Sequence, residues 1–91
     1  MRESKIERTV CRWAKDKGCI VIKQTSPGNR GIPDRLFIRN GKCLFLEFKA
    51  PGKKPTKLQL KWMSDLWLNQ TPSFACDDIE QGQRLIIQYL L

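Results

Sequence analysis

Three residues near the middle of the chain could do chemistry together, namely the carboxylates Asp34 and Glu47 and the ammonium group of Lys49. Carboxylate oxygens are good ligands for Mg²⁺ and Mn²⁺, hard ions that proteins commonly hold with one or two carboxylates and the phosphates of a substrate. A lysine beside them could offset negative charge on that substrate. These residue types predict a divalent-metal site, if the fold brings the three side chains together.

A β-hairpin would position these residues. The dipeptide Asn40-Gly41 lies between two apolar-rich runs, and we expect strands at 34–39 and 42–49. Asn-Gly in this position is the strongest short-range hairpin signal, because a two-residue type I′ turn needs positive φ at both central residues. The second run is almost wholly apolar, which indicates a strand buried on both faces in the middle of a sheet.

The hairpin register decides how close the carboxylates come. With Asn40 and Gly41 as the loop, Asp34 faces Glu47 directly across the two strands. Directly opposed side chains have Cβ atoms about 4.5–5.5 Å apart, and two like charges there are destabilising. Because strand side chains alternate between faces, Lys49 lies on the same face as Glu47. The register therefore predicts a cation between the two acids.

Size and charge restrict the partners of the protein. The chain has 91 residues, which we interpret as one domain, 1–91. An oligomer partner, a metal or a disulfide would help to stabilise its small core. Lys and Arg total 17 against 9 acidic residues, so the formal net charge is +8. The expected partner is a polyanion. Nucleic acid is favoured over a membrane, because no long apolar span, signal-peptide pattern or lipidation motif is present. We therefore expect a cytoplasmic protein.

Two residue types limit the chemistry. The chain has no histidine, which excludes Ser/His/Asp and Cys/His triads, His-ligated zinc and a histidine general base. Its cysteines lack C-x-x-C spacing, so a zinc ribbon is not expected. Buried free thiols in a reducing cytosol are favoured over a disulfide framework. The cysteines are Cys11, Cys19, Cys43 and Cys76.

Helices and further strands surround the hairpin. An amphipathic helix is predicted over 4–17, with Gly18 at its end and with Ser4 and Glu7 in the pattern of a capping box. Turn-forming residues predict an irregular loop over 25–31. We also expect a strand over 19–23, a helix from the N-cap Thr56 to about Leu68, a strand over 73–76 and a last helix capped by Asp77 or Asp78. The order is α-β-β-β-α-β-α.

These elements carry three short motifs, which are Gly31-Ile32-Pro33-Asp34, Glu47-Phe48-Lys49 and, on the following helix, Gln59 with Trp62. Together they resemble the VRR-Nuc family of the PD-(D/E)xK nuclease superfamily. The resemblance covers most of the chain, because the order of elements also agrees. It implies an α/β fold with a restriction-endonuclease-like core, in which helices flank a mixed central sheet.

The resemblance implies a catalytic role for each matched residue. Asp34 and Glu47 would ligate Mg²⁺ or Mn²⁺, together with the backbone carbonyl of Phe48. Lys49 would position or help to activate the attacking water and offset charge on the scissile phosphate. Gln59 would lie beside this lysine. No organic cofactor is implied.

Structural explanations compete with some of these roles. Glu7 matches an additional acidic residue that such folds bring to the metal, but a capping box explains it without any metal. Gln59 could be an ordinary polar position on a helix. Asp34 could be a turn residue at the start of a strand. The acidic residue at the paired position, Glu47, favours the metal-ligand interpretation of Asp34.

Basic residues near the predicted end of the hairpin form a candidate DNA-binding surface. They could be a solvated loop and helix face, but their position directly after the second strand favours contacts with backbone phosphates. The tryptophans fall near apolar helical stripes, which favours core or dimer contacts over base stacking. No base-reading motif is present, so selection by DNA structure is favoured over selection by sequence. The basic residues are Arg30, Lys53, Lys54, Lys57 and Lys61.

We interpret the chain as a metal-dependent, structure-selective DNA endonuclease. Stand-alone members of the family resemble Holliday junction resolvases that act as homodimers on four-way junctions, and a dimer would also relieve the small core. A flap or nicking nuclease with the same active site remains open. So does a non-catalytic basic nucleic-acid-binding module, for which metal and Lys49 would be irrelevant. A small free-standing nuclease suits a phage whose protein acts in the host cytoplasm.

Overall fold

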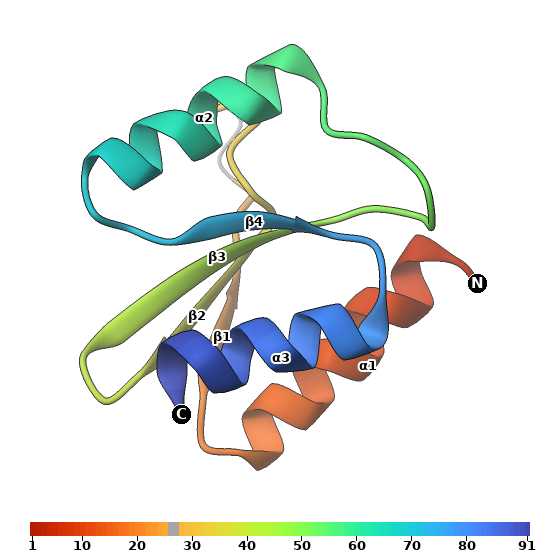
Figure 1. Ribbon diagram of the computed structural model, residues 1–91, viewed down its shortest axis with the longest axis vertical. Coiled ribbons are helices and arrows are strands. Elements are labelled where there is room, and N and C mark those ends of the chain that lie inside the picture. Colours follow the sequence, from red (N-terminus) through yellow and green to blue (C-terminus); the bar gives the residue numbers. More distant parts are fainter. Residues whose placement is uncertain (26–27) are drawn as a thin grey trace.

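The computed structural model describes residues 1–25 and 28–91, which form three helices and one four-stranded sheet (Figure 1). The predicted α-β-β-β-α-β-α order is confirmed, and the predicted boundaries agree to within one residue. The predicted loop over 25–31 includes positions 26 and 27, which lie outside the described residues. The elements are α1 (Glu3–Asp16), β1 (Ile20–Lys23), β2 (Arg35–Arg39), β3 (Lys42–Phe48), α2 (Lys57–Leu68), β4 (Ser73–Cys76) and α3 (Ile79–Leu90).

The sheet is mixed, with the strand order β1-β2-β3-β4. β1 pairs with β2 and β2 pairs with β3 in antiparallel orientation, whereas β3 and β4 are parallel. β3 therefore has a hydrogen-bonded neighbour on each side, and its residues Leu44, Leu46 and Phe48 are fully buried. The predicted central position of this strand is confirmed, but its burial on both faces is confirmed only in part. Leu44, Leu46 and Phe48 share one face, and on the other face Cys43 and Phe45 are half-buried.

The hairpin between β2 and β3 has the predicted turn and register. Asn40 and Gly41 both have positive φ, at 54° and 75°, as a type I′ turn requires. The paired residues run from the turn to Arg35, which lies opposite Leu46. One step beyond this last pair, the same register leads to the two carboxylates.

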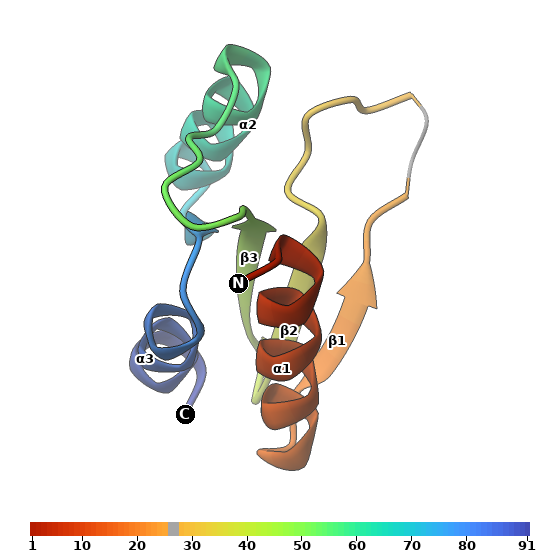
Figure 2. The same ribbon diagram turned by 90° about the vertical axis from the view of Figure 1, so that its right-hand side faces the viewer.

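Helices cover the two faces of the sheet unequally. α1 and α3 pack together on one face, whereas α2 lies on the other, beside β4 (Figures 1 and 2). Met63 is the one buried residue of α2. No helix in the described parts of the chain is long and apolar enough to cross a membrane. The main core lies between the sheet and α1 with α3, and its fully buried members include Ile6, Val10, Ala14, Phe37, Leu44, Leu46, Phe48, Ile86 and Leu90.

Strand alternation assigns the charged residues of the hairpin to opposite faces. Phe37 and Leu44 are paired and belong to the core under α1 and α3. Arg35 is two positions from Phe37 and shares its face. Asp34 and Glu47 are out of phase with these residues, so they lie on the α2 face. The acids and the neighbouring arginine therefore belong to different sides of the sheet.

The first helix has a different start from the one we expected. Its N-cap is Arg2, and no side chain caps it, so the prediction of a capping box between Ser4 and Glu7 is wrong. The reason is that the helix already begins at Glu3, so Ser4 lies inside its first turn, and the Glu7 carboxylate accepts a hydrogen bond from Arg35. The helix ends at Asp16, and Gly18 terminates it as predicted, with a positive φ of 92° that suits glycine.

The tryptophans make structural contacts at the margin of the core. Trp13 packs against the core from α1. Trp67 is 43% exposed, and its ring lies edge-on to that of Phe74 at a centroid distance of 5.4 Å. The Trp62 indole N–H donates to the carbonyl of Arg30 at 2.9 Å. These contacts agree with the prediction of structural roles.

All four cysteines are free thiols, as predicted. Three of them, Cys11, Cys19 and Cys76, are buried, and Cys43 is half-buried. Burial raises the pKa of Cys11 and of Cys76 to about 11. Because a thiolate is the reactive form of cysteine, these two side chains act as small apolar core residues.

Candidate active site

The hairpin places the two carboxylates at one end of the sheet. Asp34 directly precedes β2, and Glu47 is the penultimate residue of β3. Asp34 Oδ1 accepts a hydrogen bond of 3.3 Å from the backbone N–H of Phe48, so the Asp34 side chain is turned toward β3. The two acids also repel each other electrostatically, and the charge of Asp34 therefore raises the pKa of Glu47.

Both acids hold their protons more tightly than free carboxyl groups do. Burial raises the pKa of Asp34 to about 6, against the effect of the backbone N–H that it accepts. Burial also raises the pKa of Glu47 to about 7, with a further increase from Asp34 and an opposing effect from Lys49. The protein alone therefore compensates two negative charges here only in part, and a cation would favour the ionised pair.

Glu47 has a partner on each side. It is 7% exposed. Its Oε2 atom accepts a hydrogen bond of 3.2 Å from the Nε2 atom of Gln59 on α2. The Nζ atom of Lys49 lies 3.9 Å from the same oxygen. Three of the four predicted catalytic residues thus meet at a single carboxylate oxygen.

The start of α2 determines the position of Gln59. Thr56 is the N-cap, as predicted, and its Oγ1 accepts from the backbone N–H of Gln59 at 3.2 Å. The Gln59 side-chain oxygen accepts from the backbone N–H of Thr56 at 2.9 Å. Because this capping box fixes the amide oxygen, the amide nitrogen is directed toward Glu47. One conformation of Gln59 therefore both caps α2 and contacts Glu47, and the Thr-x-x-Gln pattern could have indicated the cap.

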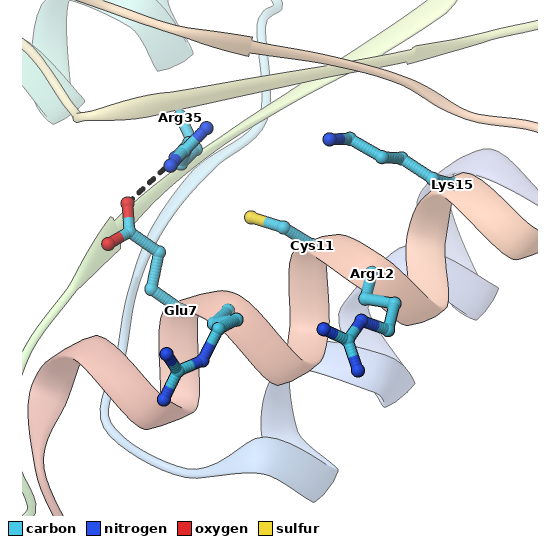
Figure 3. A pocket seen from close by; sticks show the side chains of 6 residues that line it. Glu7, Cys11, Arg12, Lys15 and Arg35 are labelled. Atoms are coloured by element: carbon cyan, nitrogen blue, oxygen red, sulfur yellow. Dashed lines mark hydrogen bonds and ion pairs between the residues drawn. The ribbon is translucent and has the colours of Figure 1, made fainter.

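Glu7 occupies the opposite side of the hairpin. Its Oε2 atom lies 2.7 Å from Nε of Arg35 (Figure 3). Its charge nevertheless acts on Asp34, whose pKa it raises. In the described residues, no group of three His, Cys, Asp or Glu side chains is arranged to hold a metal ion. The structure thus brings Asp34 and Glu47 together, whereas Glu7 pairs with Arg35. Our sequence analysis missed this arginine, although strand alternation predicts that Arg35 and Asp34 lie on opposite faces of the sheet.

The Gly-x-Pro-Asp segment packs closely against α2. Gly31 has a φ of 88°, and a Cβ atom there would lie 2.6 Å from Cγ of Leu58. Only glycine fits this close approach without displacement of the leucine. One residue earlier, the carbonyl of Arg30 is held by the Trp62 indole while its side chain is exposed. These contacts fix the segment that leads into Asp34.

The predicted DNA-binding lysines lie around the start of α2. Lys53, Lys54 and Lys57 are exposed. Lys57 is in the first turn of α2, which contains no acidic residue, so positive charge there adds to the positive end of the helix dipole. Lys61 differs, because its ammonium group lies 3.0 Å from the carboxylate of Asp65. The first three lysines are thus better placed to meet phosphates than Lys61.

The donor set at the hairpin end fits a hard divalent cation. Asp34 and Glu47 supply carboxylate oxygens at raised pKa, and both are neighbours of Phe48, whose carbonyl is the third oxygen that we predicted. Oxygen ligands of this kind suit Mg²⁺ and Mn²⁺. The two carboxylates are buried and their charges are only partly compensated, so a bound cation would stabilise their ionised forms.

Known proteins share both the sequence and the fold. The chain is 48% identical over 62 residues to a protein of Acyrthosiphon pisum secondary endosymbiont phage 1 described as "Putative nuclease p44", and this stretch covers 67% of each chain. A solved structure described as a VRR_NUC domain superposes with a TM-score of 0.85, at 25% identity over 96% of both chains. No protein-family model matches the chain.

A mixed sheet flanked by helices, with paired acids and a lysine at the end of its central hairpin, is the arrangement of the PD-(D/E)xK nuclease class. Within this class, the chain belongs to the VRR-Nuc family of nucleases. The family resemblance and the fold class inferred from the sequence are both confirmed.

Proposed function

We propose that the protein is a divalent-metal-dependent endonuclease that hydrolyses phosphodiester bonds in DNA. The observation that supports this most strongly is the burial of Glu47 directly beside a second carboxylate. A buried pair of ionised acids is unfavourable unless a cation joins it. Family membership provides the reaction class, and the acid pair provides a site for the ion that such a reaction would use.

Each active-site residue has a role that its contacts support. Asp34 and Glu47, with the carbonyl of Phe48, would hold Mg²⁺ or Mn²⁺. When bound, the ion would lower the pKa of a water molecule and neutralise charge on the phosphate. Lys49, beside Glu47, would orient the attacking water and stabilise charge that develops on the scissile phosphate. Gln59, fixed by its capping box, holds the Glu47 carboxylate in place.

Glu7 acts on this site through its charge in our proposal. It raises the pKa of Asp34 while its carboxylate stays with Arg35, and it would become a ligand only after leaving that arginine. Titration calorimetry with Mn²⁺ tests this order of importance. We expect Asp34→Asn to weaken binding strongly and Glu7→Gln to weaken it less. An equal loss of Mn²⁺ affinity in the two variants would instead indicate that Glu7 ligates the metal directly.

The proposed substrate is branched DNA, and the proposed active species is a homodimer that cuts a four-way junction. Exposed lysines surround the start of α2, next to Glu47, and can contact backbone phosphates of any sequence. The edge strand β1 exposes two large apolar side chains, with Ile20 60% and Ile22 40% accessible, which supports burial against a second copy. Similarity to a phage protein supports action of a phage-encoded enzyme in the host cytoplasm.

The test incubates purified protein with a four-way junction, a flap, a splayed arm and a linear duplex, each with Mg²⁺, Mn²⁺ or EDTA. Asp34→Ala and Lys49→Ala are run in parallel, with Lys42→Ala as control, because Lys42 is exposed at the turn end of β3. We expect metal-dependent paired cuts in the junction, lost in the first two variants and kept in the control. Light scattering of the same samples should give the mass of a dimer.

Other outcomes of this test identify the alternatives. If the protein cuts only flaps, or only nicks duplexes, the proposed active site stands. The proposed substrate is then wrong, and the protein is a flap or nicking nuclease instead of a resolvase. If Lys49→Ala retains full function and EDTA has no effect, the protein is a non-catalytic nucleic-acid-binding module. Cleavage of no substrate by the wild type would contradict the proposed function.

A further inference from the structure

A second positively charged surface lies on the α1 side of the hairpin. There, α1 and the start of β2 line a groove of about 450 Å³ (Figure 3). Four of its six residues are cationic and one is acidic. We call this surface the α1 groove, and its residues are Glu7, Arg8, Cys11, Arg12, Lys15 and Arg35.

The positive charge of the α1 groove is largely uncompensated. Arg8, Arg12 and Lys15 are exposed, and none of them forms an ion pair with another residue in 1–25 or 28–91. The acid of the groove, Glu7, is already neutralised by Arg35 at 2.7 Å. Asp16 is a further acid close by, lining the adjoining hollow beside Arg12. Even with Asp16 included, cations outnumber acids around the groove.

The groove has the chemistry of a phosphate-binding surface. Guanidinium groups present several N–H donors in a plane, which suits phosphate oxygens. No aromatic ring lines the groove, so it offers no surface on which a base could stack. Cys11 remains a neutral thiol, because burial raises its pKa to about 11. These properties favour the backbone of a nucleic acid over its bases.

The length of the groove suits consecutive phosphates. Helix geometry separates Arg8 from Lys15 by about 10.5 Å along the axis, at about 1.5 Å per residue. One strand of DNA carries a phosphate about every 3.4 Å along the duplex axis. The span from Arg8 to Lys15 therefore corresponds to about three steps between phosphates, so the three cations of α1 can each meet a different phosphate of one strand.

The groove also adjoins the active site on the side away from α2. Arg35 lines the groove and directly follows Asp34 in the chain. In Figure 2, the end of β3 lies between α1 on one side and the loop that leads into α2 on the other. The paired acids are thus flanked by two positive surfaces, the α1 groove and the exposed lysines Lys53, Lys54 and Lys57.

We propose that the α1 groove binds the phosphodiester backbone of a second arm of a branched DNA substrate, while the lysines near α2 bind the arm that is cut. This inference rests on the proposed function, because it assumes a nucleic-acid substrate at the paired acids. Two separated positive surfaces suit a molecule in which two duplexes diverge at the cleavage point. A linear duplex would engage only one of them at a time.

The test compares two double variants that lose the same charge. Arg8→Ala/Arg12→Ala removes two groove cations, and Lys42→Ala/Arg84→Ala removes two exposed cations that do not line the groove. Fluorescence anisotropy in EDTA, with a labelled four-way junction and with a labelled linear duplex for comparison, gives the binding constants between about 50 and about 200 mM NaCl. Circular dichroism checks that each variant is folded.

We expect the groove variant to bind the junction at least about tenfold more weakly than wild type. The slope of log K against log salt should fall in magnitude by about 1.8, which corresponds to two lost phosphate contacts at about 0.9 each. Arg12→Gln alone should lower it by about 0.9. The control pair should leave the slope unchanged.

Equal slopes for the groove variant and the control would overturn the groove proposal, as would the same loss on a linear duplex as on the junction. Binding is measured without metal, so these results do not depend on cleavage. If the groove variant shows the expected loss while wild type cuts nothing, the groove proposal stands and the proposed nuclease function fails. If wild type cuts the junction while the groove variant and the control bind it alike, the proposed nuclease function stands and the groove proposal fails.

Discussion

The two faces of the sheet are built differently. The face toward α1 and α3 is closed by large apolar side chains, of which Phe37, Leu44 and Ile86 are fully buried. The face toward α2 is covered thinly, since Met63 is the one buried residue of that helix and Leu60 is 52% exposed. On this second face, polar contacts between the hairpin and α2 take the place of an extensive core.

This difference separates stability from chemistry within a very small protein. The α1 and α3 face provides most of the buried apolar area, which is the dominant favourable term in folding. The α2 face holds Glu47 by hydrogen bonding and charge, with Gln59 and Lys49 as partners. Changes on the first face should therefore unfold the protein, whereas changes on the second should inactivate it while the fold remains.

The largest effect is expected on the closed face. Phe37→Ala removes a fully buried ring and should lower the free energy of unfolding by about 3–5 kcal/mol. Leu60→Ala on α2 serves as the comparison, and a change of roughly 0.5 kcal/mol is expected for this exposed side chain. Urea denaturation measures both. Similar losses in the two variants would show that the faces contribute equally to stability.

The next effect is expected on activity. Glu47→Gln keeps the size of the side chain and removes its charge, so the rate of DNA cleavage should fall by about 10²–10³-fold. Stability at neutral pH should be unchanged or higher, because a buried charge is removed. Asp65→Asn is the control, since Asp65 is an exposed acid on α2. A Glu47→Gln variant that unfolds would contradict the separation of stability from chemistry.

A smaller effect should appear in the dependence of stability on pH. Folding raises the pKa of Asp34 from 3.8 to about 6 and that of Glu47 from 4.5 to about 7. Between about pH 4 and about pH 7, the folded protein therefore binds protons that the unfolded chain has released, and stability falls as pH rises through this range. Melting temperatures measured across it should decline in wild type.

The same measurement has a matched control and a metal arm. In Asp34→Asn/Glu47→Gln the decline should be reduced, because both titrating groups are gone. Mg²⁺ at pH 7 should raise the melting temperature of wild type and not that of the double variant, since ligand binding to the folded state stabilises it. A decline of equal slope in both proteins would mean that other groups cause it.

The smallest effect concerns the link between the start of α2 and the active site. Thr56→Ala removes the hydroxyl that caps α2 and should lower the free energy of unfolding by about 0.5–2 kcal/mol. It should also reduce cleavage activity, because the capping box orients Gln59 toward Glu47. Asp78→Ala removes the cap of α3 at similar cost and should leave activity unchanged. Equal cleavage activity in Thr56→Ala and Asp78→Ala would show that the cap of α2 does not contribute to catalysis.

Local patterns were sufficient to predict the order of the elements and the position of the two carboxylates, whereas the mixed sheet came from the family resemblance. The Asn40-Gly41 turn determines the register of the hairpin, because only a two-residue loop with positive φ at both positions joins these strands. That register alone brings Asp34 toward Glu47. The helices and their ends at Gly18, Thr56 and Asp78 were also predictable from short patterns, since caps act within a few residues.

Contacts between distant elements were not predictable in the same way. The Ser4 and Glu7 pattern indicated a cap, but Glu7 bonds to Arg35, which lies 28 positions further along the chain. A local pattern describes which partners are near in the chain and not which are near in space. The α1 groove was missed for the same reason, because it combines one face of α1 with a strand.

The sequence by itself determined the hairpin and its paired acids, because turn chemistry and strand alternation act over a few residues. It also indicated the family, through short motifs that occur in a suitable order along the chain. Only the tertiary structure decided which side chains complete the site. Packing of α2 against the sheet directs Gln59 to Glu47. Packing of α1 on the opposite face brings Glu7 within hydrogen-bonding distance of Arg35. The orientation of a helix on a sheet depends on the fit of the whole core, which no short stretch of sequence contains.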